Sequence, residues 1–204
     1  MMHMPEGTVI SVNVARVRDF RVLDGRTIRT GLFKKPVSGL VMARRGGLAG
    51  DGIGDRSVHG GEDKAVYAYS QEDVEWWEGQ LDRQLEEGFF GQNLTLAGMA
   101  ASEAVVGERW RVGGALLEVA GPRMPCFKLA ARVGDRGFER RFAKAGRPGA
   151  YLRVLEEGVL AAGDPVEVSE RPEHGVTVAL VARAILGDKE LRPRVLEALQ
   201  QRSR

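Results

Sequence analysis

The chain is poor in the residues that cross-link small folds or bind metals in clusters: its 204 residues include one cysteine and three histidines. A single cysteine excludes an internal disulfide, and no zinc-finger spacing is present. Long apolar runs are also missing. No segment approaches the ~20 apolar residues of a membrane span, and the N-terminus lacks the basic and apolar regions of a signal peptide. We therefore expect a soluble protein of the reducing cytoplasm, without a membrane partner.

An excess of charge of one sign is lacking too. The 30 basic and 28 acidic residues leave a net charge of +2, which gives no support for a nucleic-acid partner. The length suits one well-buried domain with an appendage and is too short for two ordinary domains.

Glycine, by contrast, is abundant, with 27 residues that separate short apolar runs. This pattern is typical of a strand-rich, turn-rich domain, and the spacing of the runs suits barrels and sandwiches. Strands are expected over residues 8–15, 26–32, 65–70, 93–96, 109–112, 116–120, 151–156 and 165–169.

Helices are fewer. Residues 71–81 follow Ser70, a good N-cap, and place Val74, Trp77 and Leu81 on one face, so Trp77 and its neighbour favour core packing over ligand stacking. Shorter helices are expected over residues 126–132 and 137–145.

The organisation changes near residue 170. A polar, turn-prone link precedes two helix-compatible segments, residues 176–186 and 189–201. The chain is therefore divided into a domain over residues 1–169 and a small C-terminal helical extension over residues 170–204. Acidic residues interleave with the arginines of the extension, which favours a solvated face over a nucleic-acid surface.

The single cysteine stands in a conspicuous segment, Gly121-Pro122-Arg123-Met124-Pro125-Cys126-Phe127-Lys128. The two prolines restrict the backbone and favour an extended Met124. Arg123 and Lys128 would lower the pKa of the thiol and favour the thiolate, which attacks electrophiles or binds metals. The alternative is a buried, inert cysteine that packs as a small hydrophobe.

A second dense segment lies between the early strands and the tryptophan helix. Residues 46–55 are too glycine-rich for a packed element and match neither a P-loop nor a dinucleotide-binding site, so they form a loop that approaches something closely. His59 and Lys64 follow. His59 suits proton transfer, metal binding or donation to an anion, and Lys64 suits a phosphate; the alternative for His59 is a hydrogen bond within a turn.

The order of these segments resembles the MOSC domain family, and within it the YiiM-type branch. The resemblance covers nearly the whole chain. The matching segments are Lys34-Lys35-Pro36-Val37, Gly47-Leu48-Ala49-Gly50-Asp51 with Asp55, His59-Gly60-Gly61-Glu62-Asp63-Lys64, Phe90-Gly91-Gln92-Asn93-Leu94, Pro122-Arg123-Met124-Pro125-Cys126-Phe127-Lys128 and Arg147-Pro148-Gly149-Ala150-Tyr151. Two positions depart from the family pattern: Gln92 stands where glutamate is common, and Ile53 where a polar residue is common.

The resemblance implies a mainly β fold, a β-barrel-like domain with several helices, that binds molybdenum cofactor. Cys126 would be the metal ligand, since a soft thiolate suits a sulfur-rich metal sphere. His59 would serve as proton donor or as a supporting partner of the metal ligand, and Lys64 as anion anchor or as a cation that lowers the pKa of the thiol. Both would join Cys126 in catalysis. The remaining cofactor-binding residues implied are Arg123, Lys128, Arg147, Gly60, Gly61, Asp55 and Asn93, with Lys34 or Arg45 as further phosphate ligands.

The activity implied is a molybdenum-dependent oxidoreductase that reduces N-hydroxylated compounds, such as hydroxylaminopurines and hydroxamates, in detoxification. The electrons would come from a separate flavin or iron–sulfur reductase, because one cysteine cannot hold a cluster. Two alternatives stand beside it: a carrier of molybdenum cofactor or of a Cys126 persulfide, and a metal-free Cys126–His59 thiol enzyme. The family resemblance also brings an association with pyridoxal phosphate, whose domain this chain is too short to contain. The chain would act as a monomer or a homodimer.

Overall fold

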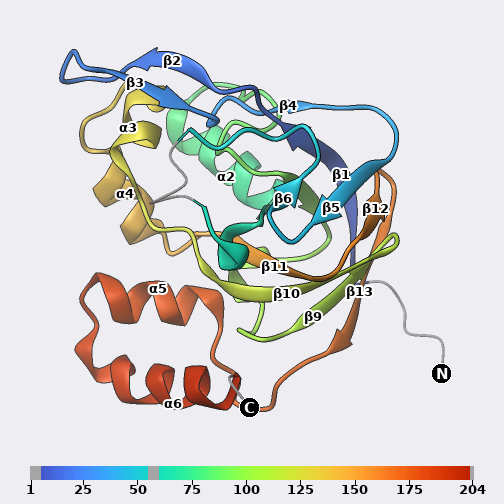
Figure 1. Ribbon diagram of the computed structural model, residues 1–204. Coiled ribbons are helices and arrows are strands. Elements are labelled where there is room, and N and C mark those ends of the chain that lie inside the picture. The colour runs from blue at the N-terminus through green and yellow to red at the C-terminus, as the bar shows by residue number, and fades with distance from the viewer. Residues whose placement is uncertain (1–5, 55–59, 203–204) are drawn as a thin grey trace.

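The fold is a closed β-barrel of seven strands, here in a computed structural model that describes residues 6–54 and 60–202 (Figure 1). The strand order is β13-β9-β10-β11-β7-β8-β1, and pairing of β1 with β13 closes the barrel. Neighbours are antiparallel except β7 and β8. The strands are β1 (Gly7–Val14), β7 (Val66–Ser70), β8 (Leu94–Ala97), β9 (Arg109–Val112), β10 (Ala115–Pro122), β11 (Ala150–Glu156) and β13 (Pro165–Glu170). The predicted mainly β, barrel-like fold is confirmed.

The barrel interior is filled by aliphatic side chains, because alternate residues of each strand point inward. Val9 and Val12 of β1 and Leu117 of β10 are fully buried. Strand β7 is buried along its whole length, since helix α2 (Gln71–Leu81) covers its outer side (Figure 1). This strand therefore separates the aliphatic interior from a second core.

The second core is aromatic and lies among β7, α2, α3 (Phe127–Val133) and α4 (Phe138–Ala145). Trp77 is buried there, and its ring centroid lies 4.8 Å from that of Phe138, which confirms core packing. Ser70 occupies the predicted N-cap position of α2, but its side chain makes no capping hydrogen bond. Its hydroxyl donates to the Met99 carbonyl and accepts from the Ala101 amide instead, so it fastens β7 to the segment after β8.

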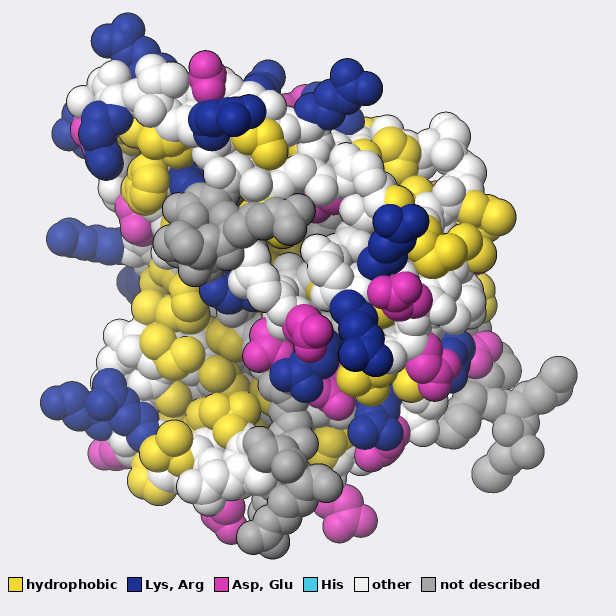
Figure 2. Space-filling view, in the orientation of Figure 1, with side chains coloured by type: hydrophobic (Ala, Val, Ile, Leu, Met, Phe, Trp, Pro, Cys, Tyr) yellow, Lys and Arg dark blue, Asp and Glu magenta, His cyan; other side chains and the backbone are white. Residues whose placement is uncertain are grey.

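The C-terminal helical extension is also confirmed. It consists of α5 (Val178–Leu186), a short 3-10 turn η3 (Lys189–Leu191) and α6 (Arg192–Arg202), which lie together below the barrel in Figure 1. Arg171 donates to the buried Glu108 and thereby ties the link to the barrel. The boundary at residue 170 stays a prediction. Apolar side chains gather on the left of the molecule at the level of α4 and α5 (Figure 2). Among the described helices, none has the length and apolar character required to cross a bilayer.

Short strands that the sequence did not indicate complete the molecule. They are β2 (Arg18–Arg21); β4 (Lys35–Pro36), which pairs with β1; and β5 (Val41–Arg44), β6 (Gly47–Leu48) and β12 (Gly158–Leu160), which form a small sheet. Strand β2 forms a hairpin with β3 (Thr27–Thr30), which confirms the strand expected over residues 26–32. Two 3-10 turns are η1 (Glu62–Lys64) and η2 (Ala101–Glu103).

The expectation of no packed element over residues 46–55 is therefore wrong for its first part. Gly47 and Leu48 pair with β5, and Leu48 is buried because the small sheet covers the barrel interior there.

Candidate functional site

A cavity of about 320 Å³ lies where the end of β10, the hairpin strand β3 and the loop after β6 meet. Its walls come from six separated parts of the chain. The lining residues are Thr30, Gly31, Leu32, Lys34, Asp51, Gly52, Ile53, Gly54, Lys64, Ala65, Tyr67, Gly91, Asn93, Pro122, Arg123, Met124, Pro125, Cys126, Lys128 and Tyr151. Of the predicted site residues, the structure brings Cys126, Lys64, Arg123, Lys128 and Asn93 together here.

Cys126 stands between β10 and α3 in an extended conformation, with φ −146° and ψ 152°. It is the residue that precedes the first turn of α3, and it is half-buried. Arg123 Nη2 lies 3.8 Å from its Sγ. The proline-bounded segment therefore holds the thiol at the cavity wall beside a fixed cation.

Arg123 is the most deeply placed of these cations, with 7% of its surface exposed. Its Nη1 donates to the Phe90 carbonyl at 2.7 Å, and its guanidinium lies over the Tyr67 ring. Within the described ranges, no carboxylate pairs with it. Burial by itself would lower the pKa of Arg123, but the neighbouring Cys126 and two tyrosines raise it, so the charge persists. A buried cation without a carboxylate is costly unless an anion meets it.

Lys34 and Asp51 form a buried ion pair on the cavity wall. Asp51 also accepts hydrogen bonds from the Ala15 amide at 2.9 Å and from Asn93 Nδ2 at 2.9 Å. Burial lowers the pKa of Lys34 and Arg123 lowers it further, against an opposing contribution from Asp51. Sequence reasoning singled out Asp55 in this segment and missed Asp51 as a site residue; the only signal was its place beside Gly50.

Asn93 lines the cavity, but its side chain is occupied by the scaffold. Its Oδ1 accepts from the Tyr67 amide and its Nδ2 donates to the Asn13 carbonyl and to Asp51. Tyr67 and Tyr151 close the wall nearby. Burial raises the pKa of both phenols, so they are neutral hydroxyl groups at pH 7.

One wall of the cavity forms where two backbone segments pack directly against each other at glycines. A Cβ on Gly31 would lie 1.8 Å from the Gly52 carbonyl oxygen, and one on Gly54 would lie 2.4 Å from the Arg29 carbonyl oxygen. The loop after β6 therefore touches β3 and its continuation directly. This confirms the expectation that the glycine-rich segment approaches something closely.

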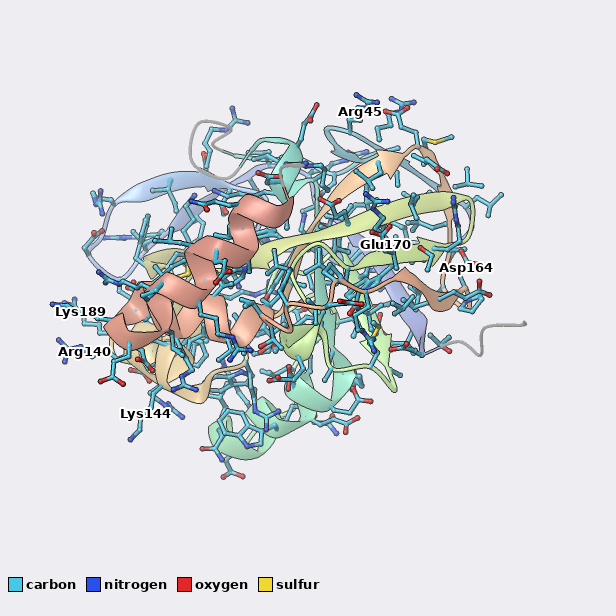
Figure 3. The ribbon with its side chains drawn as sticks, turned by 90° about the horizontal axis from the view of Figure 1, so that it is seen from below. Arg45, Arg140, Lys144, Asp164, Glu170 and Lys189 are labelled. Atoms are coloured by element: carbon cyan, nitrogen blue, oxygen red, sulfur yellow. The ribbon has the colours of Figure 1, made fainter. Side chains whose placement is uncertain are left out.

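Other predicted site residues lie elsewhere. Arg147 pairs with the buried Asp73 and stacks on Trp76, away from the cavity lining. Arg45 is exposed at an edge of the molecule (Figure 3). The position of Arg147 therefore gives no support to the phosphate role predicted for it.

The remaining predictions concern the segment before η1. Gly60 and Gly61 do not line the cavity, and Gly61 adopts φ +106°, which favours glycine for conformational reasons. Asp55 and His59 lie outside the described residues, so their predicted roles stay predictions.

The two departures from the family pattern fall in different places. Ile53 lines the cavity and makes that part of the wall apolar. Gln92 is buried outside the lining; its Nε2 donates to Thr95 at 3.3 Å, and its Oε1 has no hydrogen-bond partner.

The chemistry of the lining points to an anionic ligand. Its described side chains include four cations, Lys34, Lys64, Arg123 and Lys128, against one carboxylate, Asp51. Over residues 6–54 and 60–202, no group of three or more histidine, cysteine or acidic side chains suits a metal ion. A metal beside Cys126 would thus need most of its donors from its own ligand. An anionic cofactor that carries sulfur donors fits this lining.

Comparison with known proteins gives consistent results. Residues 55–167 match the family model of the MOSC domain. The Bacillus subtilis protein YflK is 38% identical over 176 residues, which cover 86% of this chain and 79% of that protein. A Gibberella moniliformis protein named "Reductase" is 30% identical over 183 residues, which cover 88% of this chain and 32% of that protein. The crystal structure of YiiM from Geobacillus stearothermophilus superimposes with a TM-score of 0.76 at 27% identity, over 96% of this chain and 98% of that one.

Proposed function

The chain belongs to the MOSC domain family, and from that premise we propose that it binds molybdenum cofactor in the cavity beside Cys126 and acts as the terminal reductase of N-hydroxylated compounds. The observation that carries the proposal is Arg123. A buried guanidinium with no carboxylate partner in the described ranges stands 3.8 Å from the single cysteine of the chain. An anionic cofactor would supply the missing negative charge.

The roles of the lining residues follow from their chemistry. Cys126 would bind the metal as a thiolate, since soft sulfur ligands suit such a centre. Arg123 and Lys128 would hold anionic oxygens of the cofactor, Arg123 with a rigid fork and Lys128 as a point charge. Lys64 at the end of η1 lies on the same cavity wall. When bound, the cofactor supplies two-electron redox chemistry.

The reaction proposed is the conversion of an N-hydroxylamine to an amine and water. It consumes two electrons and two protons: the N–O bond breaks, the nitrogen takes one proton and the oxygen takes the other. The electrons would come from a flavin or iron–sulfur reductase. A relative that carries the name "Reductase" supports a reductive reaction. The chain matches only 32% of that longer protein. The site of action proposed is the cytoplasm.

The first test measures molybdenum per chain in protein expressed together with the cofactor pathway, in wild type and in Cys126→Ala. We expect near-stoichiometric molybdenum in the wild type and at least a tenfold loss in the variant, because removal of a direct ligand costs more than the 10–100-fold typical of outer-sphere changes. Turnover of a hydroxylaminopurine with reduced methyl viologen as electron source completes the experiment.

The outcomes separate the alternatives. Molybdenum with turnover supports the reductase, whereas molybdenum without turnover would favour the carrier. Absence of molybdenum from both proteins would contradict the proposal and leave the thiol enzyme, whose activity would resist cofactor depletion and respond to iodoacetamide.

A further inference from the structure

We propose that Lys34, held in place by Asp51, is the proton donor of this cavity and gives its proton to the oxygen atom that leaves the substrate. The inference rests on the proposed reductase function. It assigns a residue to a step for which the sequence had suggested His59. Lys34 would be a catalytic residue and Asp51 a positioning residue that acts through it.

The position of Lys34 carries the first part of the argument. The residue is 7% exposed, yet it belongs to the cavity lining. A lysine on a flexible four-carbon chain normally places its ammonium in water. Here the ammonium is kept inside, in contact with both oxygens of Asp51.

Asp51 is itself fixed by two contacts besides the one with Lys34. The Ala15 amide and Asn93 Nδ2 bind its two oxygens from different parts of the barrel. The carboxylate is thus oriented by the scaffold, and the lysine that it binds is oriented with it. Such support by a second residue is what a group needs to hold a proton at a defined point.

The charged surroundings favour proton release. Asp51 faces Lys34 from the loop after β6 and stabilises the ammonium, while Arg123 faces it from the end of β10 and opposes the ammonium. Burial also opposes it, so the pKa of Lys34 lies below the usual 10.5. A proton donor works best when its pKa approaches the operating pH.

The two tyrosines and the arginine on the wall are poorer donors. Burial raises the pKa of Tyr67 and Tyr151 and makes their protons harder to remove. Arg123 does not release a proton in proteins. Lys64 is an exposed side chain on η1, whereas Lys34 is buried.

The proton balance of the step is simple. The reductase partner would supply two electrons, for which the bound cofactor would provide the redox chemistry, and the N–O bond of the substrate would break. Lys34 Nζ gives one proton to the departing oxygen, the second proton comes from solvent, and solvent then restores the ammonium.

The test compares holoprotein variants with molybdenum content, melting temperature and the pH dependence of kcat as readouts. Lys34→Arg keeps the cation and its pairing with Asp51 but cannot release a proton near neutral pH. We expect unchanged molybdenum content and a kcat lower by about 100-fold or more, within the range usual for loss of a general acid. The matched control is Lys35→Arg: Lys35 is exposed, pairs with Glu86 and does not line the cavity.

Asp51→Asn tests the positioning role. It removes the contact that raises the pKa of Lys34, so the alkaline limb of the kcat profile should move to lower pH. A purely structural role would lower the melting temperature without moving this limb. Nitrogen-15 NMR of lysine-labelled, cofactor-free protein gives a readout independent of turnover: we expect Lys34 Nζ to titrate below the usual lysine value of 10.5, with Lys34→Arg used for the assignment.

Each result has a defined consequence. Full activity in Lys34→Arg, or titration of Lys34 at or above 10.5, would overturn this inference while an active wild type upholds the proposed function. Loss of molybdenum in Lys34→Arg would overturn it as well and make Lys34 a cofactor ligand. A molybdenum-loaded wild type that reduces no N-hydroxylated compound would overturn the proposed function and this inference together.

Discussion

Two arginines that look alike in the sequence, Arg123 after a proline and Arg147 before one, lie in opposite electrostatic settings. Arg123 is buried at the cavity, donates to a backbone carbonyl and has no carboxylate among its described neighbours. Arg147 pairs with the buried Asp73 and stacks on Trp76. The charge of Arg147 is balanced by Asp73 within the protein. The charge of Arg123 is not balanced by any described carboxylate, so an anionic ligand would neutralise it.

The difference separates a charge that stabilises the folded protein from a charge that is available to bind a ligand. Around Arg147, neighbouring side chains also bind the backbone: Tyr69 donates to the Arg147 carbonyl at 2.9 Å and Tyr67 to the Pro148 carbonyl at 2.8 Å. Around Arg123, the contacts orient the cation without neutralising it. Substitution of each arginine should therefore separate ligand binding from folding.

The largest effect is expected at the cavity. Arg123→Met should lower the molybdenum content by about 10–100-fold, the range found when a residue that supports a metal ligand is lost. The cofactor-free protein should melt within a few degrees of wild type, because replacing a buried charge with an apolar side chain of similar volume is often neutral. Elemental analysis and thermal melting check both parts. Retained molybdenum would contradict the comparison.

An intermediate effect is expected at the other arginine. Among the described residues, Arg147→Met leaves the buried carboxylate of Asp73 with the Ser102 hydroxyl as its remaining side-chain partner. Because the arginine side chain is 38% exposed, we expect a loss of about 1–3 kcal/mol rather than the full cost of breaking a buried pair. Denaturant unfolding measures it, and the molybdenum content should not change.

The control for that substitution is Arg140→Met. Arg140 extends from α4 into solvent (Figure 3). Its loss should therefore alter the free energy of unfolding by about 0.5 kcal/mol at most. Equal destabilisation by the two variants would show that Asp73 does not need its partner.

The smallest effect is the pH dependence of that loss. Burial raises the pKa of Asp73, and Arg147 opposes the rise. In Arg147→Met the pKa should rise further, so the folded state binds a proton that the unfolded state releases, and stability falls as pH increases through this window. The destabilisation should be larger at pH 7 than near pH 4. Unfolding curves at the two pH values give the answer, and a difference of the opposite sign would remove Asp73 from the explanation.

Sequence alone predicted the long elements of the fold because their patterns are local. The alternating residues of β1, β10 and β11 and the apolar face of α2 are visible within one window of the chain. The short strands β2, β4, β5, β6 and β12 were missed. Strand β12, for example, acquires its structure from β5, more than a hundred residues earlier.

The site divides in the same way. The segment from Pro122 to Lys128 could be identified from its prolines, cations and cysteine, and the structure brings it to the cavity. Asp51 was missed because its importance comes from contacts with Ala15, Lys34 and Asn93. The pairing of Arg147 with Asp73 could not be predicted, because the two residues are 74 positions apart.

The contact between Gly31 and Gly52 has a consequence for how this protein tolerates mutation. Neither residue has a side chain to bind a ligand, yet a single added methyl group at Gly31 would collide with the backbone opposite. Saturation mutagenesis scored by cofactor retention should therefore mark Gly31, Gly52 and Gly54 as intolerant as Cys126. A map of such positions would outline the cavity by the places where the two backbones touch.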